Sequence, residues 1–248
     1  MSNERLRSAM STAGKTYVDL AERIEVDPKT VERWVTLSRV PHRRNRVQIA
    51  ALLGEDEHFL WPEVASDPRS VKATESELAH LYPNRGAVPI DTWVHLLESA
   101  TSQIDLWAFA GSFLHDAIPD FGGLLTSAAR RGVRVRLLFG DPASRSVAER
   151  GEEEGIGDLL ASRCRLTWNY LSPVLATPGI EARAHDVTVY ASIFRFDDNA
   201  LVNPHALGSP ASHSPVLHIR KLDGGRLFDH YIASFERGWS GGRRHSAE

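Results

Sequence analysis

Cysteine is almost absent from this sequence of 248 residues, in which Cys164 is the only one. A single cysteine excludes an intramolecular disulfide and excludes zinc sites built from several cysteines. The chain also lacks an apolar run long enough to cross a bilayer and an N-terminal stretch of the signal-peptide type. We therefore expect a protein of the cytoplasm that does not enter a membrane.

Histidine is more frequent, with eleven in the chain, but its spacing does not favour a metal site. His205, His213 and His218 fall on different predicted elements, and no His-x3-His pair or cysteine accompanies them. The sequence therefore predicts no metal and no other cofactor.

A polar stretch interrupts the apolar patterning between residues 63 and 74. It contains Ser66-Asp67-Pro68-Arg69-Ser70, a composition typical of linkers. The hydrophobic fraction of 42% is ample for folded cores on both sides of it. We expect a first domain over 1–62, a linker over 63–74, a second domain over 75–239 and a disordered tail over 240–248.

The first domain is organised around residues 16–35, which predict two short helices joined by a tight turn. Tyr17, Leu20, Ala21 and Ile24 recur at helical spacing and form one apolar face. Asp27-Pro28 then supplies a capping carboxylate and a proline at the first helical position, so a second helix begins there. Its inward residues are Val31 and Trp34, which leaves its polar residues on the outer surface.

Positive charge is concentrated on this second helix and the segment after it. From Pro28 to Arg46 there are six basic residues and one acidic residue, whereas the whole chain carries a net charge of −3. Such a patch is typical of phosphate binding, although a charge run can also be a plain solvated face. We assign Lys29, Thr30 and Arg33 to the major groove of DNA, and we assign to backbone phosphates Arg39, His42, Arg43, Arg44 and Arg46.

The pattern resembles the helix-turn-helix domains of phage-repressor type, the XRE/Cro family. The resemblance covers about residues 3–61 and rests on Ala21 at the helix crossing, on Val31 and Trp34, and on Asp27-Pro28-Lys29-Thr30. Glu25 departs from it, because the family often has glycine in the turn. The resemblance implies an all-α domain that binds double-stranded DNA. The alternative is an ordinary helical hairpin packed in a core.

The second domain alternates strand and helix patterns. Residues 104–110 and 133–139 read as buried strands separated by a helix over 121–131, which favours a parallel sheet core in an α/β domain. Residues 187–196 predict a longer strand that turns at Asp197-Asp198-Asn199 and returns over 200–203.

A late hairpin after such a framework resembles the phospholipase-D-like fold, a sandwich with a mixed sheet. Active members carry His-x-Lys-x4-Asp on this hairpin, and the same register here reads Tyr190-x-Ser192-x4-Asp197. A phenol ionises near pH 10 and a serine carries no positive charge, so neither replaces the histidine nucleophile or the lysine. We therefore expect no phosphodiester cleavage by this motif, and no enzyme. The resemblance also implies a homodimer, because active members combine two copies of the motif.

A cleft at strand ends remains, and such clefts bind small ligands. The residues expected to line it are those of the degenerate motif and its neighbours: Tyr190, Ser192, Arg195, Asp197, His185, Asn203 and His205. Gly111-Ser112 and Gly140-Asp141 follow buried strands, where open α/β sheets place ligands. The alternative for Asp197-Asp198-Asn199 is turn chemistry alone, and Tyr190 could be a core tyrosine.

These patterns together predict a sequence-specific transcriptional regulator that reads an inverted repeat as a homodimer and senses a small effector. One alternative is a phosphodiester- or nucleotide-acting enzyme, tethered to DNA by its helix-turn-helix, that uses a set such as His185, Asp186 and His205. Another is a DNA-bound adaptor whose second domain contacts a protein.

Overall fold

The computed structural model describes residues 2–65, 73 and 75–245. The chain divides into two compact units, Met1–Ala73 and Thr74–Glu248. Most of the predicted linker, residues 66–72 and 74, lies outside the described residues, and Pro62–Ala65 before it forms a short helix.

The described part of the N-terminal unit consists of helices and their connections. They are α1 (Glu4–Thr12), α2 (Tyr17–Arg23), α3 (Pro28–Thr36), α4 (Arg43–Leu53), α5 (Glu57–Leu60) and α6 (Pro62–Ala65). One apolar cluster joins them, and its fully buried members include Leu6, Leu20, Val31, Ile49, Leu60 and Trp61.

Helices α2 and α3 begin at capping residues that the sequence makes recognisable. The Thr16 hydroxyl accepts from the Asp19 backbone N–H, and the Asp19 carboxylate accepts in return from the Thr16 backbone. The Asp27 carboxylate accepts from the Lys29 backbone N–H at 2.8 Å, an N-cap worth about 1 kcal/mol. Between the helices Glu25 has φ 57°, so this turn uses the left-handed region that favours glycine.

The apolar residues of α4 and α5 are not all buried. Val47 and Phe59 are 49% and 45% exposed. On α4 it is Ile49 and Ala50 that are buried, and both belong to the apolar cluster of the unit.

An eight-stranded mixed sheet forms the middle of the C-terminal unit, in the order β1-β7-β6-β5-β2-β3-β4-β8. The strands are β1 (Leu78–Tyr82), β2 (Gln103–Ala108), β3 (Arg134–Gly140), β4 (Ile180–His185), β5 (Ala191–Phe196), β6 (Asn199–Pro204), β7 (Val216–Arg220) and β8 (Arg243–His245). Strands β2, β3 and β4 are parallel, and the other neighbours pair antiparallel. The predicted α/β unit with a mixed sheet is confirmed.

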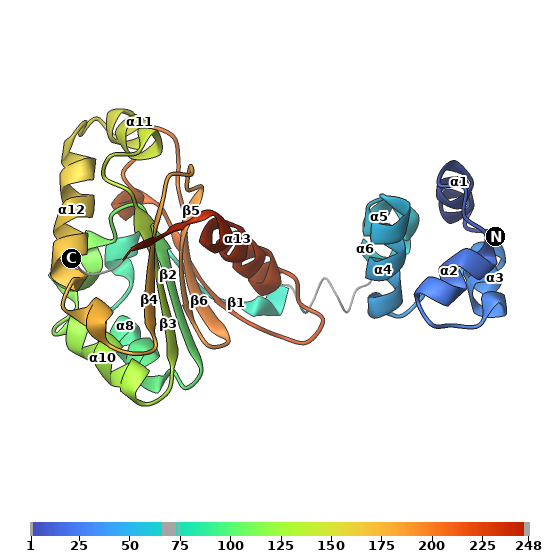
Figure 1. Ribbon diagram of the computed structural model, residues 1–248, viewed down its shortest axis with the longest axis horizontal. Helices are drawn as coiled ribbons and strands as arrows, with labels where there is room; N and C mark the ends of the chain where they lie inside the picture. Colours follow the sequence, from blue (N-terminus) through green and yellow to red (C-terminus); the bar gives the residue numbers. More distant parts are fainter. Residues whose placement is uncertain (1, 66–72, 74, 246–248) are drawn as a thin grey trace. The chain divides into compact units, whose positions relative to one another are not determined.

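Helices cover both faces of this sheet. They are α8 (Ile90–Ser99), α9 (Ser112–Ala117), α10 (Phe121–Arg130), α11 (Arg145–Glu153), α12 (Leu159–Leu171) and α13 (Leu227–Gly241), with short 3-10 turns η1 (Arg85–Ala87), η2 (Val174–Ala176) and η3 (Ala211–His213). Figure 1 shows α8, α10 and α12 on one side of the sheet and α13 on the other. The larger core lies on the first side, around Phe121, Phe139 and Phe194.

Helix α13 is fixed to the sheet by a buried polar network and by its own first turn. The Arg136 guanidinium binds the Asp105 carboxylate at 2.7 Å and the Glu236 carboxylate of α13 at 2.7 Å. At the start of α13, the buried Glu77 carboxylate accepts backbone N–H groups of Arg226 and Leu227, each at 2.8 Å. Glu77 therefore satisfies donors that a helix N-terminus otherwise leaves unpaired.

The predicted disordered tail is wrong for residues 240–245. Helix α13 continues to Gly241, and Arg243–His245 pairs with β4 as the edge strand β8. The His245 ring also lies against the Trp168 ring, with 4.0 Å between centroids. Pairing with a distant strand orders this segment although its composition is that of a flexible end.

Candidate functional site

Helix α3 presents a polar face that its buried residues fix in orientation. Val31, Trp34 and Val35 are buried against the other helices of the unit, and Lys29 and Arg33 are exposed. Thr30, at the first turn, is partly exposed. A rigid helix with cations and a hydroxyl on its open face is suited to contacts with base edges and phosphates in a major groove.

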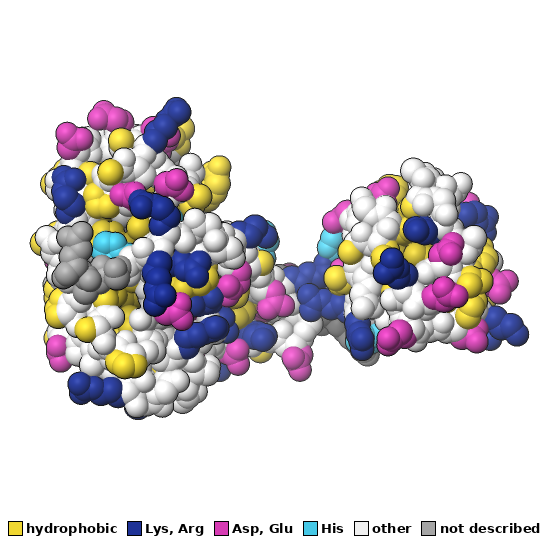
Figure 2. Space-filling view, viewed as in Figure 1, with side chains coloured by type: hydrophobic (Ala, Val, Ile, Leu, Met, Phe, Trp, Pro, Cys, Tyr) yellow, Lys and Arg dark blue, Asp and Glu magenta, His cyan; other side chains and the backbone are white. Residues whose placement is uncertain are grey.

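More basic side chains follow α3. Arg39 and His42 in the connection, and Arg43 and Arg44 at the start of α4, are all exposed. Figure 2 shows that one face of the N-terminal unit carries Lys and Arg interspersed with Asp and Glu. This face carries both signs of charge, whereas the segment 28–46 has six basic residues and one acidic residue.

Arg46 does not fit the phosphate-binding role that the sequence predicts for it. Its guanidinium binds the Glu57 carboxylate at 2.7 Å and donates to the Pro41 carbonyl at 2.7 Å, and its side chain is 11% exposed. These contacts fasten the start of α4 to α5. Arg46 is therefore a structural residue, because its charge is paired with Glu57 and two of its nitrogens already donate within the unit.

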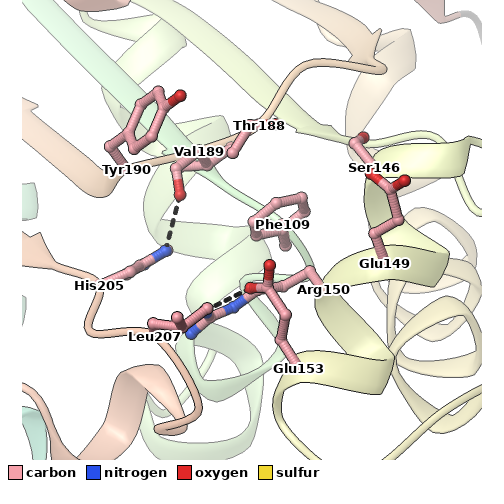
Figure 3. A pocket seen from close by; sticks show the side chains of 10 residues that line it. All are labelled: Phe109, Ser146, Glu149, Arg150, Glu153, Thr188, Val189, Tyr190, His205 and Leu207. Atoms are coloured by element: carbon pink, nitrogen blue, oxygen red, sulfur yellow. Dashed lines mark hydrogen bonds and ion pairs between the residues drawn. The ribbon is translucent and has the colours of Figure 1, made fainter.

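Two neighbouring cavities lie in the C-terminal unit where β2 ends and β5 begins. The first has a volume of about 180 Å³ and is lined by Phe109, Ser146, Glu149, Arg150, Glu153, Thr188, Val189, Tyr190, His205 and Leu207. In Figure 3, Tyr190 and His205 face residues of α11 across the Phe109 ring. Tyr190, which is 81% exposed, forms part of the rim.

His205 stands between the two cavities and is held at both ring nitrogens. Nδ1 lies 3.0 Å from the Val189 carbonyl oxygen, and Nε2 lies 3.0 Å from the Ser192 hydroxyl. Because a carbonyl only accepts, Nδ1 carries the proton and Nε2 accepts from Ser192. Burial, and then the charge of Arg150, lower the pKa of His205 to about 4, so the ring is neutral at pH 7.

Arg150 closes the lower side of the first cavity. Its guanidinium binds the Glu153 carboxylate at 3.2 Å and the Glu154 carboxylate at 2.8 Å, and it donates to the Ser209 carbonyl at 2.8 Å. These bonds tie α11 to the segment after β6. Arg150 therefore shapes the cavity wall and has little donor capacity left for a ligand.

The second cavity, of about 70 Å³, shares Phe109 and His205 with the first. Its polar lining comes from Arg85, Ser112, Glu154, Arg163, Ser192, His205 and Ser212. Gly111 and Ser112, which the sequence places after a buried strand, are part of this lining. The cavity lies at the carboxyl end of β2, where open α/β sheets commonly bind ligands.

Arg195 and Asp197 were expected in the same pocket as Tyr190, and this is wrong. Both belong to the opposite end of β5. The Asp197 carboxylate accepts backbone and hydroxyl hydrogen bonds from Thr101 and Ser102 and a backbone bond from Gln103 at 2.7 Å. Arg195 donates to the Asp197 carbonyl at 2.8 Å and lies 3.5 Å from Asp105.

Asp197 therefore ties the β5–β6 turn to the start of β2. Burial by itself raises the pKa of its carboxyl, but the hydrogen bonds from Ser102, Thr101 and Gln103 lower it far more. The turn itself places Asp197 at φ 51°, a conformation that aspartate tolerates better than most residues.

His185 and Asn203 were also predicted to line the pocket, and the structure places both in the core. His185 is 2% exposed, and its Nε2 lies 3.1 Å from the Ala108 carbonyl. The Asn203 amide donates to the Ser214 and Pro215 carbonyls, at 3.2 and 2.9 Å. Of the predicted set, only Tyr190, Ser192 and His205 line the cavities.

The sequence offered little signal for the other lining residues. Arg85 and Arg163 lie far from the hairpin in the chain, and no motif contains them. Phe109 had a signal, since it follows β2 directly, but only the fold shows that it lines both cavities.

Other reactive groups do not form a site in the part of the chain that the structure describes. Within it, no cluster of three or more His, Cys, Asp or Glu residues has the arrangement of a metal site. Among the same residues, no helix combines the length and apolar character needed to span a membrane. Burial raises the pKa of the Cys164 thiol to about 12, which leaves it unreactive at neutral pH.

The chain has no match among protein-family models, and no curated protein matches it. Among solved structures it is similar to Nuc, a phospholipase D family member from Salmonella typhimurium, with 16% identity and a TM-score of 0.40 over 67% of this chain and 97% of that one. It is also similar to TrmBL2, an archaeal chromatin protein described as having a novel mode of DNA binding, with 14% identity and a TM-score of 0.42 over 93% and 88% of the two chains. Similarities of this size leave the function to be argued from the residues themselves.

Proposed function

We propose that the protein is a sequence-specific DNA-binding regulator of transcription that acts as a homodimer. Its N-terminal unit serves as an XRE/Cro-type helix-turn-helix, and its C-terminal unit serves as a catalytically degenerate phospholipase-D-like domain that binds a small ligand. The observation that carries the proposal is helix α3, capped by Asp27 and fixed by Val31, Trp34 and Val35, with Lys29 and Arg33 on its open face.

In this proposal, residues on the open face of α3 contact bases and the basic residues after α3 contact phosphates. Arg33 carries a guanidinium fork that matches the acceptor edge of a guanine, and Lys29 and Thr30 flank it near the start of the helix. Arg39, His42, Arg43 and Arg44 contact phosphates, which set the register on the duplex without reading sequence. In a dimer, two α3 helices about 34 Å apart reach successive major grooves of an inverted repeat.

A binding role for the C-terminal unit is supported by the cavities and by the residues at the motif positions. Tyr190 and Ser192 supply neither a nucleophilic imidazole nor a lysine charge. The enzyme alternative uses a set such as His185, Asp186 and His205, but His185 is buried under Phe109 whereas His205 lines the cavities. We therefore assign the unit to ligand binding.

Footprinting on the DNA upstream of the protein's own gene, across a salt titration, tests the proposal. Protection of an inverted repeat that persists as salt rises supports a sequence-specific dimer, and uniform binding that disappears with salt contradicts it.

Arg33→Ala sharpens this test. We expect it to weaken binding to the protected site by about 1–3 kcal/mol and to leave binding to random DNA nearly unchanged. Arg7→Ala is the matched control, because Arg7 is an exposed arginine of α1 in the same unit. Equal losses on both DNAs would remove the base-reading role of Arg33.

A further inference from the structure

Arg85 is a shielded cation that lacks a carboxylate partner. Its guanidinium lies over the Phe113 ring, 4.0 Å from the centroid, and it lines the second cavity. Among the described residues it has no ion pair and no side-chain hydrogen bond. Most shielded arginines in this chain differ, since Arg46, Arg136 and Arg150 each bind a carboxylate.

An unpaired guanidinium in this position is energetically costly. Burial is the main reason that the pKa of Arg85 falls to about 10, and at neutral pH the group is still charged. Five N–H donors and one charge are thus held at a cavity wall, and no described residue accepts a hydrogen bond from them. Cation–π contact with Phe113 offsets part of this cost but accepts no hydrogen bond.

One carboxylate, that of Glu154, lines the cavity and favours the charge on Arg85, but it is already bound to another arginine. Glu154 contributes to the lining, but its carboxylate binds Arg150 at 2.8 Å and its side chain is 9% exposed. Arg163 adds a second cation to the same lining, again with no ion pair among the described residues. The cavity therefore has an excess of positive charge.

Hydrogen-bond donors surround this charge. Ser112 and Ser212 line the cavity with hydroxyl groups that can donate to an oxyanion. The volume of about 70 Å³ accommodates a group of a few heavy atoms, since one water occupies about 30 Å³ in the liquid. The adjoining cavity of about 180 Å³ offers the Phe109 and Tyr190 rings and the Leu207 side chain to a larger, less polar part.

We propose that the ligand of the C-terminal unit is an organic oxyanion, whose phosphate or carboxylate group binds Arg85 and Arg163 in the second cavity and whose organic part occupies the first. This inference rests on the ligand-binding role proposed above and names the chemistry of that ligand. Guanidinium is the side chain best matched to either group, because its fork donates two parallel hydrogen bonds.

The test is thermal unfolding of the full chain in rising concentrations of inorganic phosphate or of acetate, with chloride at the same ionic strength as the reference. A ligand at ten times its Kd raises the midpoint of a protein of this size by about 3–6 °C. A saturating rise in phosphate identifies a phosphate site, and a rise in acetate alone identifies a carboxylate site. No rise in either anion beyond the chloride reference overturns the proposal.

Two variants test whether the rise in the unfolding midpoint depends on Arg85. Arg85→Gln removes the charge and should abolish the rise, whereas Arg220→Gln, an exposed arginine at the end of β7 that lines neither cavity, should keep it. In chloride alone Arg85→Gln should melt no lower than the wild type, which shows that it folds. An undiminished rise in Arg85→Gln overturns the proposal.

DNA binding measured on the same samples separates this inference from the proposed function. A normal footprint without any anion effect refutes the oxyanion site and leaves the DNA-binding role intact. An Arg85-dependent anion effect in a protein that fails to footprint supports the site and refutes the DNA-binding role.

Discussion

The two ends of strand β5 hold shielded charges in opposite ways. At the end where β5 stops, Arg136 binds Asp105 and Glu236, and Asp197 accepts hydrogen bonds from the chain before β2. At the end where β5 starts, Arg85 lines a cavity and forms no ion pair among the described residues, since the Glu154 carboxylate of the same lining binds Arg150. An arginine side chain is thus paired with carboxylates at one end, which we call the saturated end, and has no ion pair among the described residues at the other.

The pKa directions follow from this difference. Burial opposes the charge on Arg136, but its bonds to Glu236 and Asp105 outweigh burial and raise its pKa. No such bonds reach Arg85, so burial prevails and its pKa falls. The paired charge of Arg136 holds helix α13 to the sheet, whereas the charge of Arg85 at the cavity is available to a ligand.

The largest effect is expected at the saturated end. Asp105→Asn should lower the free energy of unfolding by about 3–5 kcal/mol, because it leaves the Arg136 charge without its buried partner. Urea denaturation followed by circular dichroism measures this. Asp116→Asn, at a carboxylate whose side chain is 61% exposed, is the control and should change stability little. A loss below about 0.5 kcal/mol in Asp105→Asn would show that Arg136 does not depend on Asp105 as its buried partner.

At the cavity end, the expected effect is a dependence of stability on pH that comes from His205. His205 has a pKa of about 4 in the folded chain against an ordinary value of 6.5, so the unfolded chain binds more protons between these values. Its contribution to stability is complete above pH 6.5 and decreases as the pH falls toward 4, by up to about 3 kcal/mol.

Comparing the wild type with His205→Gln isolates this contribution from that of the carboxylates and other histidines. The difference between their unfolding free energies should shrink as the pH falls through the window. Parallel pH profiles for the two proteins would mean that His205 is not shielded in the folded state.

A smaller effect is expected at the turn that ends β5. Asp197→Asn keeps a residue that tolerates the left-handed backbone but removes the negative charge that strengthens the bonds from residues 101–103. We expect a loss of about 1–2 kcal/mol in urea denaturation. The control is Asp198→Asn at the exposed neighbour, which should change the free energy of unfolding little. Equal losses for the two variants would show that the turn conformation, and not the Asp197 carboxylate, stabilises this region.

Local signals allowed part of the fold to be predicted. The Asp27-Pro28 cap marks the start of α3, and apolar runs mark β2 and β3, because caps and burial patterns are encoded by neighbouring residues. Strand β8 was missed since its order comes from pairing with β4, and nothing within residues 243–245 indicates that pairing.

The difference between local signals and long-range contacts also explains which site residues could be predicted. The register of Tyr190, Ser192 and Asp197 along one strand is visible in the sequence, but β5 spans the sheet, so its first and last residues cannot share a pocket. Arg85 enters the cavity from η1, a turn that precedes β2 and carries no motif. Proximity of this kind arises only from tertiary structure.

The contact between Glu77 and the start of α13 has a consequence for the order of folding. Glu77 and its backbone partners are separated by about 150 residues. The strand that follows Glu77, β1, has β7 as its one neighbour in the described sheet, and β7 lies near the other end of the chain. During synthesis the first strand of the sheet must therefore wait for nearly the whole unit to emerge before it can pair. Such long-range closure slows folding and leaves an unpaired strand exposed in the interval, so β1 is the segment most dependent on the chain being finished.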